Sequence, residues 1–457
     1  MTIVPGEDAT EPYRTTEPSP SRADDHVECA ACEPSLSWAV GQVCEECGAR
    51  SELTAGAACP ACLGPLVVDY RIPEGLRAGG RAAWLARPAT LFRFQELLPP
   101  LPRVFRDRLE FPSSPLRRAV RLGEQLGVDQ LWIKDDTVLA SGSFKDRPAA
   151  VAVAWAAAHG QPWVGCASTG NLAAATARAA ARLGLPCVVV VPSGLPSSKL
   201  LLVRHLGARI LEVEGSYDDA NRIAQLVEDA RGGGFVNIGL RPIYAEGSKT
   251  LLFETWADLS GRLPDAVFVP LGSGALLSAT HRAQEQLRAW AGASEPPARL
   301  IGTQPEGCSP IVDAFERGDE EIRPVERSTS IAESLAIGHP ASGRSALRAL
   351  RATGGLADRP RRAEVIRGVR ELARWEGVYS EPAGGSVVAT LRRLREAGTI
   401  RRSDRVVLYL TGAGWKTPAA VRPRGIESRP LRVDPRRPEL TSLPLPDAGS
   451  PVGGSAW

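Results

Sequence analysis

The stretch LWIKDDTVLASGSFKDRPAAVAVAWAAAHGQPWVGCASTGN, residues 131–171, decides how the rest of the sequence is interpreted. It begins with a short apolar run, Leu131–Ile133, which predicts a buried strand, and turn-forming residues follow as far as Ser143. Pro148 suits the first turn of a helix, where its missing N–H costs nothing, and the alanine-rich segment after it predicts that helix. We therefore expect Lys145 at the end of a loop, where a helix starts.

A lysine in this position has two interpretations. As a solvated surface side chain, Lys145 would pair with the neighbouring Asp146. As a partly desolvated amine among small residues, it would have a lowered pKa and could act as a nucleophile that forms a Schiff base. A second small-residue loop, STGN at residues 168–171, favours the second interpretation.

The SGSFKDR segment around Lys145 and the STGN loop resemble threonine synthase and its relatives among the fold-type-II pyridoxal-phosphate (PLP) enzymes, the tryptophan synthase beta-like superfamily. The resemblance implies that Lys145 carries PLP as a Schiff base and that Asn171 contacts the ring oxygen of the cofactor. It also implies that the STGN loop holds the substrate carboxylate, through Ser168, Thr169, Gly170 and Asn171.

Four cysteines in two CxxC pairs have the spacing of a metal site. Two such turns can place four thiolates at the corners of a tetrahedron, which is what zinc requires, in a closed and therefore structural site. A pair of redox motifs is the alternative interpretation, and it lacks a thioredoxin-like context. The cysteines are Cys44, Cys47, Cys59 and Cys62.

A third pair, Cys29/Cys32, has the same spacing and could replace the later pair. The segment CPACLGPLVVDY, however, resembles the zinc-ribbon head of many threonine synthases, and this resemblance implies the later set. Three further cysteines lie singly in apolar surroundings and are expected to be buried thiols: Cys166, Cys187 and Cys308.

Bulk properties restrict the class of protein. The 457 residues suggest two lobes with accessory segments. The net charge of +3, from 55 basic and 52 acidic residues, gives no reason to expect nucleic acid or an anionic membrane as partner. No run approaches the roughly 20 apolar residues that span a bilayer, and the N-terminus has no apolar signal core, so we expect a cytoplasmic protein.

Helical and strand patterns alternate after the STGN loop, with nearly continuous Val/Ile runs such as CVVVVP. This alternation predicts a parallel sheet covered by helices on both faces, and the resemblance implies a two-lobed α/β fold with PLP between the lobes. The predicted organisation is a disordered N-terminus (1–28), a zinc-ribbon-like segment (29–70), a catalytic region (71–420) whose smaller lobe covers about 130–237, and a disordered Pro/Arg-rich tail (421–457).

A buried strand runs into a glycine loop in AVFVPLGSGALLSATH, and a helix follows. Backbone N–H groups of such a loop, together with the helix N-terminus, form a cradle for a dianion. By resemblance this loop binds the PLP phosphate through Gly272, Ser273, Gly274 and Ala275. The strand RVVLYL ends at Thr411, and in the family a threonine at this place contacts the pyridine nitrogen of PLP.

Several residues depart from the threonine synthase pattern. The GSGAL loop is closer to the loops of serine and threonine dehydratases, and the changes expected near cofactor or substrate are Ala275, Ala336, His339 and Ala413. A histidine beside an active site could titrate near neutrality, although a structural role is the alternative for His339. The segment IYAEGSKT resembles a family segment, but a helix-capping role explains it equally well, so no catalytic role is assigned to it.

The resemblance implies a threonine synthase-like lyase, in which phosphate leaves O-phospho-L-homoserine, water adds and L-threonine results. Lys145 would then shuttle protons as general base and acid. The departures motivate an alternative, a β-replacement or β-elimination enzyme on phosphoserine, serine or threonine, similar to cysteate synthase or a dehydratase. A third interpretation is a silent, zinc-bearing interaction protein, which the intact Lys145, Asn171 and Thr411 argue against. The expected partner is a small amino acid, and homodimers are common in the family.

Overall fold

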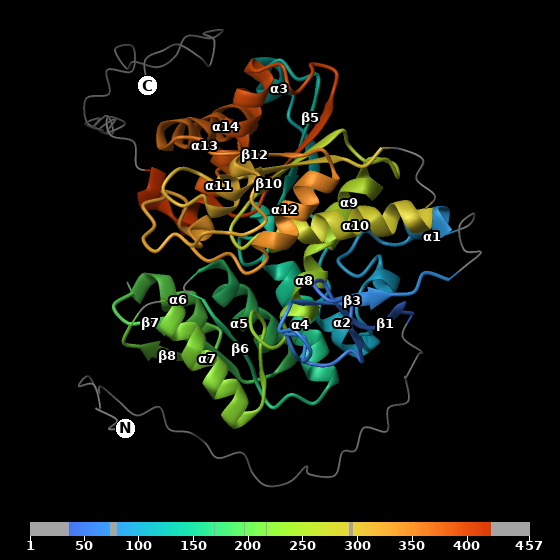
Figure 1. Cartoon of the computed structure of the whole chain (residues 1–457), viewed down its shortest axis with the longest axis vertical. Helices are drawn as coiled ribbons and strands as arrows, with labels where there is room; N and C mark the ends of the chain where they lie inside the picture. Colours follow the sequence, from blue (N-terminus) through green and yellow to red (C-terminus); the bar gives the residue numbers. More distant parts are fainter. Residues whose placement is uncertain are drawn as a thin grey trace, which may run out of the picture. The chain divides into compact units, whose positions relative to one another are not determined.

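The computed structural model of the protein describes residues 36–73, 80–168, 170–195, 197–215, 217–291 and 296–421. This part of the chain contains two helix-covered sheets and a small antiparallel sheet (Figure 1). The predicted α/β class is therefore confirmed. The segments predicted to be disordered, 1–28 and 421–457, lie outside the described residues apart from Val421, and so does the Cys29/Cys32 pair.

The larger sheet has six strands in the order β12-β11-β10-β13-β5-β4, and all neighbours are parallel except β4 and β5. Every residue of its strand β10 is buried, as expected for a parallel strand covered on both faces. In chain order the strands are β4 (Leu116–Arg118), β5 (Gln130–Asp135), β10 (Ala266–Pro270), β11 (Arg299–Thr303), β12 (Leu356–Asp358) and β13 (Arg405–Leu410).

Helices cover both faces of this sheet because successive strand residues point to opposite sides. Phe268 of β10 packs with α3, α13 and α14, whereas Val267 and Val269 pack with α9, α10, α11 and α12. These helices are α3 (Val120–Leu126), α9 (Thr250–Asp258), α10 (Ala275–Ala291), α11 (Pro310–Arg317), α12 (Gly343–Ala352), α13 (Arg362–Glu376) and α14 (Pro382–Glu396).

The smaller sheet has the order β8-β7-β6-β9 and is entirely parallel. Val189 packs on the side of α5 and Val190 on the side of α7, so helices cover both faces here too. The strands are β6 (Val164–Ala167), β7 (Cys187–Pro192), β8 (Arg209–Val213) and β9 (Gly234–Phe235), and the helices of this part are α4 (Asp146–Ala158), α5 (Asn171–Leu183), α6 (Ser197–His205) and α7 (Tyr217–Arg231).

Strand pairing places β5 in the larger sheet, since its hydrogen-bonded neighbours are β4 and β13. The smaller sheet therefore draws its strands from residues 164–235, a narrower span than the predicted lobe of about 130–237.

A three-stranded antiparallel sheet in the order β2-β1-β3 precedes the two larger ones. Tyr70 on β3 donates a hydrogen bond of 2.6 Å to Glu246 on α8, and Arg348 on α12 donates to both carboxylate oxygens of Glu46 at 2.8 Å. The small sheet is therefore anchored to the helices of the catalytic region. Its strands are β1 (Ala39–Cys44), β2 (Arg50–Ser51) and β3 (Leu66–Tyr70).

The remaining elements within the described residues are short. Three of them are α-helices and the others are 3-10 helices. They are α1 (Gly80–Ala86), α2 (Arg103–Leu109), α8 (Arg241–Ser248), η2 (Gln95–Leu97), η3 (Asp136–Val138), η4 (Glu333–Leu335), η5 (Gly414–Lys416) and η6 (Pro418–Val421).

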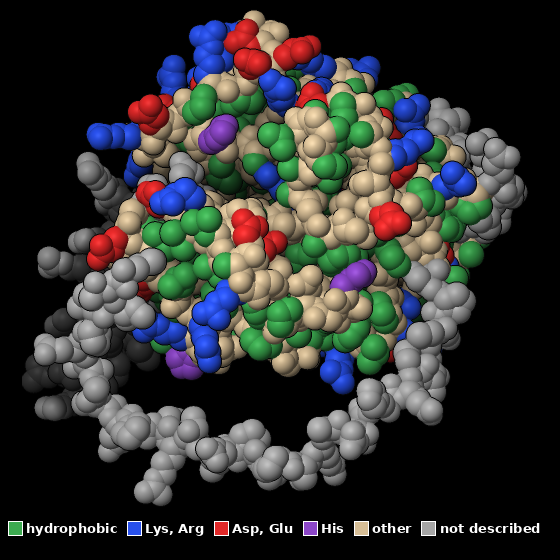
Figure 2. Space-filling model, turned by 60° about the horizontal axis from the view of Figure 1, so that its bottom comes forward, with side chains coloured by type: hydrophobic (Ala, Val, Ile, Leu, Met, Phe, Trp, Pro, Cys, Tyr) green, Lys and Arg blue, Asp and Glu red, His purple; other side chains and the backbone are tan. Residues whose placement is uncertain are grey.

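The surface carries both signs of charge. On the face drawn in Figure 2, basic and acidic side chains are interspersed, in keeping with the near balance of charges in the sequence. Within the described ranges, no helix is both long and apolar enough to cross a bilayer.

Candidate active site

Lys145 lies where the sequence predicts it, directly before α4. Its amine donates a hydrogen bond of 2.8 Å to the hydroxyl of Tyr244 and lies 4.5 Å from the centre of the Phe144 ring. The side chain is partly exposed, yet the surrounding protein lowers the pKa of Lys145 to about 8, because desolvation disfavours the ammonium form. Near neutral pH the amine can therefore hold or release a proton.

The residues that follow Lys145 hold the start of α4 in place. The carboxylate of Asp146 accepts a hydrogen bond from the backbone N–H of Ser141 at 2.8 Å. The guanidinium of Arg147 is fully buried and donates to the carboxylates of Asp136 and Glu254. The hydrogen-bond partner of Asp146 is thus the backbone of the preceding loop, and that of the Lys145 amine is Tyr244. These contacts disfavour the interpretation of Lys145 as a surface lysine paired with Asp146.

Asn171 is the first residue of α5, at the carboxyl end of β6. Its side-chain nitrogen lies 3.3 Å from each carboxylate oxygen of Glu381, a residue of the distant α14 junction. In the STGN loop, the hydroxyl of Ser168 accepts from the backbone N–H of Gly170 at 3.3 Å, and Thr169 lies outside the described residues.

Glu381 is a buried carboxylate that precedes α14. Besides Asn171, the hydroxyl of Ser334 donates to it at 3.0 Å, and burial raises the pKa of Glu381. A Cβ added to Gly412 would come within 2.5 Å of this carboxylate, so the glycine makes room for it. None of the sequence motifs quoted above includes Glu381.

The glycine loop between β10 and α10 has the shape of an anion cradle. Gly274 has a φ of 86°, and a Cβ there would come within 2.6 Å of the Ser342 carbonyl oxygen. The Ser273 carbonyl accepts from the Ser342 N–H at 2.9 Å, which holds the loop against the start of α12. The first N–H groups of a helix have no partner within the helix, so the start of the 17-residue helix α10 favours an anion such as a phosphate. The Ala275 N–H makes a long hydrogen bond of 3.5 Å to the Ser273 hydroxyl.

Thr411 follows β13 and is buried. Its carbonyl accepts a hydrogen bond of 3.0 Å from the N–H of Phe144, the neighbour of Lys145, and Ser143 forms a β-bridge with Gly412. These contacts bring the end of β13 beside the Lys145 loop. Lys416, a little further along, donates to the Ser141 carbonyl at 2.6 Å.

The predicted PLP residues therefore follow the carboxyl ends of β5, β6, β10 and β13, where parallel α/β sheets bind their ligands. The Lys145 loop contacts the Thr411 segment directly. Glu381 links the other two segments to it: its N–H donates to the Gly412 carbonyl, and its carboxylate contacts Asn171 and Ser334. The Ser334 carbonyl lies 3.4 Å from the Cβ position of Gly272. These groups fit PLP. The Lys145 amine suits the aldehyde, the Asn171 amide the ring oxygen and the Thr411 hydroxyl the pyridine nitrogen. The N-terminus of α10 suits the phosphate.

The residues that depart from the family pattern have different surroundings. Ala413 is buried and its N–H donates to the Gly142 carbonyl at 2.9 Å, whereas His339 is exposed.

Tyr244, which the sequence analysis left without a role, is the hydrogen-bond partner of Lys145. A single aromatic residue in IYAEGSKT carries no pattern that would have pointed to this contact.

The four predicted metal ligands come together at the edge of the small sheet. Their sulfur atoms all lie within 4.8 Å of one another, with 3.5 Å between Cys44 and Cys62 and 3.7 Å between Cys47 and Cys59. Thiolates bound tetrahedrally at about 2.3 Å from zinc are about 3.8 Å apart, so the cluster fits this metal. A Cβ at Gly64 would approach the Cys44 sulfur within 2.9 Å, which explains the glycine after the second pair.

A family model described as pyridoxal-phosphate-dependent enzyme matches residues 109–412, more than half of the chain. The chain belongs to this family of PLP-dependent enzymes. The matched range contains the Lys145 loop, the STGN loop, the glycine loop and Thr411.

Comparison with individual proteins shows to which group of PLP-dependent enzymes the chain is similar. The PLP enzyme is 32% identical over 401 residues to a threonine synthase of Methanocaldococcus jannaschii, an alignment that covers 86% of this chain and 96% of that protein. A threonine synthase of Methanosarcina acetivorans is 32% identical over 390 residues, covering 83% of this chain and 92% of that one. The protein is thus a PLP-dependent lyase of the threonine synthase family, as its motifs predict.

Solved structures share the fold-type-II architecture. Diaminopropionate ammonia lyase from Escherichia coli matches with a TM-score of 0.59 at 18% identity, covering 77% of this chain and 92% of that one. A fungal L-serine ammonia-lyase from Rhizomucor miehei also has a TM-score of 0.59, at 20% identity, covering 68% and 96%. At these identities the similarity concerns the fold alone.

Proposed function

We propose that this PLP enzyme converts O-phospho-L-homoserine and water into L-threonine and inorganic phosphate. The observation that carries the proposal is the alignment with a threonine synthase over 96% of that protein's length. PLP, when bound, supplies an electron sink for negative charge on the substrate. The chain itself would supply the proton transfers and the orientation.

Lys145 is the residue that we assign to proton transfer. Its pKa of about 8 lies close to neutral pH, where a general base and acid works best. Asn171 and Thr411 would orient the cofactor ring, and the loop of Gly272, Ser273, Gly274 and Ala275 would hold its phosphate through backbone N–H groups. The STGN loop would bind the substrate carboxylate.

A second candidate is elimination or replacement on serine, threonine or phosphoserine. Its support is that the Lys145 amine contacts two neutral groups, the phenol of Tyr244 and the ring of Phe144, and that alanine occupies position 413. A cation usually stabilises a phosphate leaving group. Lys416 is a cation in this region, and its amine already donates a hydrogen bond to the Ser141 carbonyl.

We also propose that Cys44, Cys47, Cys59 and Cys62 bind one structural zinc ion. The close approach of the four sulfur atoms, all within 4.8 Å of one another, supports this assignment.

The two substrate proposals are separated by one assay on the purified protein with added PLP. O-phosphohomoserine, phosphoserine, serine and threonine are supplied in turn, and threonine, phosphate and keto acid are measured. Threonine and phosphate in equal amounts from O-phosphohomoserine support the first proposal. Turnover of serine or threonine to a keto acid, with none of O-phosphohomoserine, would instead support the second.

A further inference from the structure

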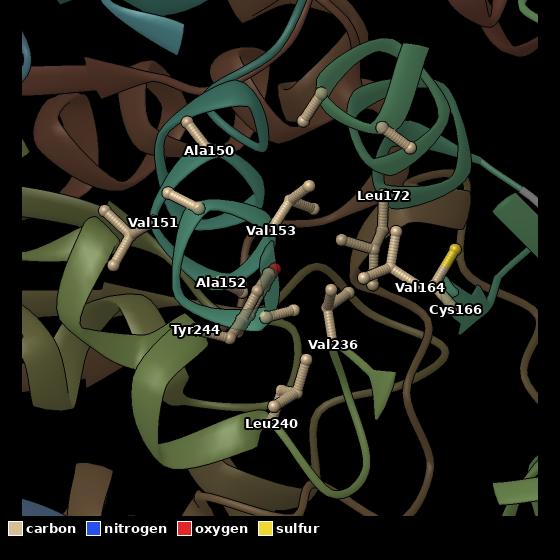
Figure 3. Close-up of a cluster of buried hydrophobic side chains, with 14 of the residues drawn as sticks. Ala150, Val151, Ala152, Val153, Val164, Cys166, Leu172, Val236, Leu240 and Tyr244 are labelled. Atoms are coloured by element: carbon tan, nitrogen blue, oxygen red, sulfur yellow. The ribbon is translucent and has the colours of Figure 1, made fainter. Parts of the chain in front are cut away.

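Helix α8 lies unusually close to α4, the helix that Lys145 begins. A Cβ added to Gly247 of α8 would come within 2.5 Å of the Pro148 Cα and 2.6 Å of the Arg147 carbonyl oxygen. A glycine at this point therefore allows the two backbones to touch, directly beside the lysine. Figure 3 shows Tyr244, on α8, reaching toward Ala152 and Val153 of α4.

Helix α8 is also held from its other side. Glu246 accepts a hydrogen bond from Tyr70 of β3 and forms a buried ion pair with Lys249. The Lys249 amine in turn donates to the Leu97 carbonyl at 2.7 Å. These buried contacts fix the position of α8 along and around its axis, so the direction of the Tyr244 side chain is set by the fold.

Tyr244 itself is 6% exposed, and its hydroxyl lies 2.8 Å from the Lys145 amine. Burial raises the pKa of Tyr244, so the phenol stays neutral and offers an oxygen that accepts from an ammonium group. The ring packs among apolar residues, which a phenylalanine would do equally well. The hydroxyl is therefore the part of the side chain that packing does not explain.

We propose that Tyr244 is a positioning residue for Lys145, whose hydroxyl holds the lysine amine in its place whenever that amine is not bonded to PLP. This inference rests on the role proposed above for Lys145. Each turnover must free the amine and later return it to the cofactor, and a fixed acceptor shortens the search over lysine rotamers. The same contact orients the amine while it exchanges protons with the substrate.

Two other groups influence the charge of the Lys145 amine. Glu381, before α14, favours the ammonium form, and so does the Cys166 thiol of β6 if it ionises. Burial raises the pKa of Cys166 far above neutrality, however, so this thiol stays uncharged. Asp146, the next residue, is engaged by the Ser141 N–H. Removing the Tyr244 hydroxyl thus removes one neutral acceptor and leaves the charges unchanged.

The test follows PLP binding to PLP-free protein rather than turnover. In this reaction the Lys145 nitrogen adds to the aldehyde carbon, one water leaves and a C=N bond forms, which absorbance reports. Only the neutral amine reacts, so the wild-type rate should rise with pH through a midpoint near the Lys145 pKa of about 8. Wild type, Tyr244→Phe and Tyr409→Phe are compared.

In Tyr244→Phe we expect a midpoint about one pH unit lower, because the ammonium form loses an acceptor, and a high-pH rate reduced about tenfold. Tyr409→Phe, which removes a buried hydroxyl on β13, should match wild type in both respects. Unchanged midpoint and rate in Tyr244→Phe would overturn the proposal and leave Tyr244 a packing residue.

Failure of the underlying function looks different. If Lys145 is not the PLP lysine, Lys145→Ala will still develop the absorbance of lysine-bound PLP. Wild type, Tyr244→Phe and Tyr409→Phe will then have the same dependence of the PLP-binding rate on pH. Thermal unfolding of each variant shows whether it is folded. Tyr244→Leu, which keeps an apolar side chain but no ring, is a second variant without the hydroxyl. A wild-type midpoint in Tyr244→Leu would also count against the proposal.

Discussion

The side-chain nitrogen of Asn171 lies 3.3 Å from both carboxylate oxygens of Glu381, although 210 residues separate them in the chain. This contact joins the start of α5, on the smaller sheet, to the residue before α14, on the larger sheet. It places a buried carboxylate, whose pKa is raised by burial, beside two of the predicted PLP residues.

Replacing this carboxylate should change the titration of Lys145. The ionised Glu381 favours the ammonium form of Lys145, so Glu381→Gln should move the pKa of the amine below its value of about 8. More neutral amine is then present at a given pH below 8. The pH midpoint of PLP binding to PLP-free protein should fall accordingly, while Glu285→Gln, at an exposed glutamate on α10, should leave it unchanged. A midpoint that rises in Glu381→Gln would contradict this electrostatic assignment.

Gly274→Ala tests the phosphate cradle. The new Cβ would clash with the Ser342 carbonyl at 2.6 Å, at a φ of 86° that alanine rarely adopts. We expect the affinity for PLP, measured by fluorescence titration, to fall about tenfold or more. Gly318→Ala is the matched control, because its φ of 75° imposes a similar backbone strain and no atom lies within 4 Å of the new Cβ. Equal PLP affinities in the two variants would exclude the loop as a phosphate site.

Metal content tests the four-cysteine cluster. Protein purified without oxygen should hold about one zinc ion per chain, and Cys47→Ser should hold less than about half of that, because one of four thiolates is lost. Cys308→Ser, which alters a buried thiol outside the cluster, should keep its zinc. The double variant Cys29→Ser/Cys32→Ser separates the two possible ligand sets. Loss of zinc in that variant would mean that the earlier pair takes part.

The buried Arg147 should matter for stability. Arg147→Met leaves the buried carboxylate of Asp136 without its ion-pair partner and leaves Glu254 paired with Lys134 alone, which costs about 3–5 kcal/mol of unfolding free energy. Arg402→Met, which breaks the exposed pair with Asp129, should cost about 0–1 kcal/mol. Urea denaturation measures both. Similar losses in the two variants would show that Arg147 does not hold the start of α4.

Short sequence motifs predicted where the candidate PLP residues lie in the fold. Lys145, Asn171 and the glycine loop each follow a strand and precede a helix, and this local pattern is enough to place them. Spacing pointed to a site of CxxC pairs, and the family resemblance chose Cys59/Cys62 over Cys29/Cys32. The sulfur atoms of the chosen set do converge.

Glu381 and Tyr244 could not be found in this way, because each depends on a close approach between distant segments. Glu381 enters the site because Gly412 leaves space for it, and Tyr244 reaches Lys145 because Gly247 lets α8 touch α4. The membership of β5 in the larger sheet is likewise non-local, since its partner β13 comes near the end of the described chain. A glycine in the sequence does not reveal which neighbour it accommodates.

The most direct test of the central claim is to trap the cofactor. Protein loaded with PLP is reduced with borohydride, digested and analysed by mass spectrometry. We predict a pyridoxyl group on Lys145, in the peptide that contains SGSFKDR, and no labelled peptide from Lys145→Ala. Label on another lysine, such as Lys134 or Lys416, or no label at all in wild-type protein, would contradict the assignment of this site.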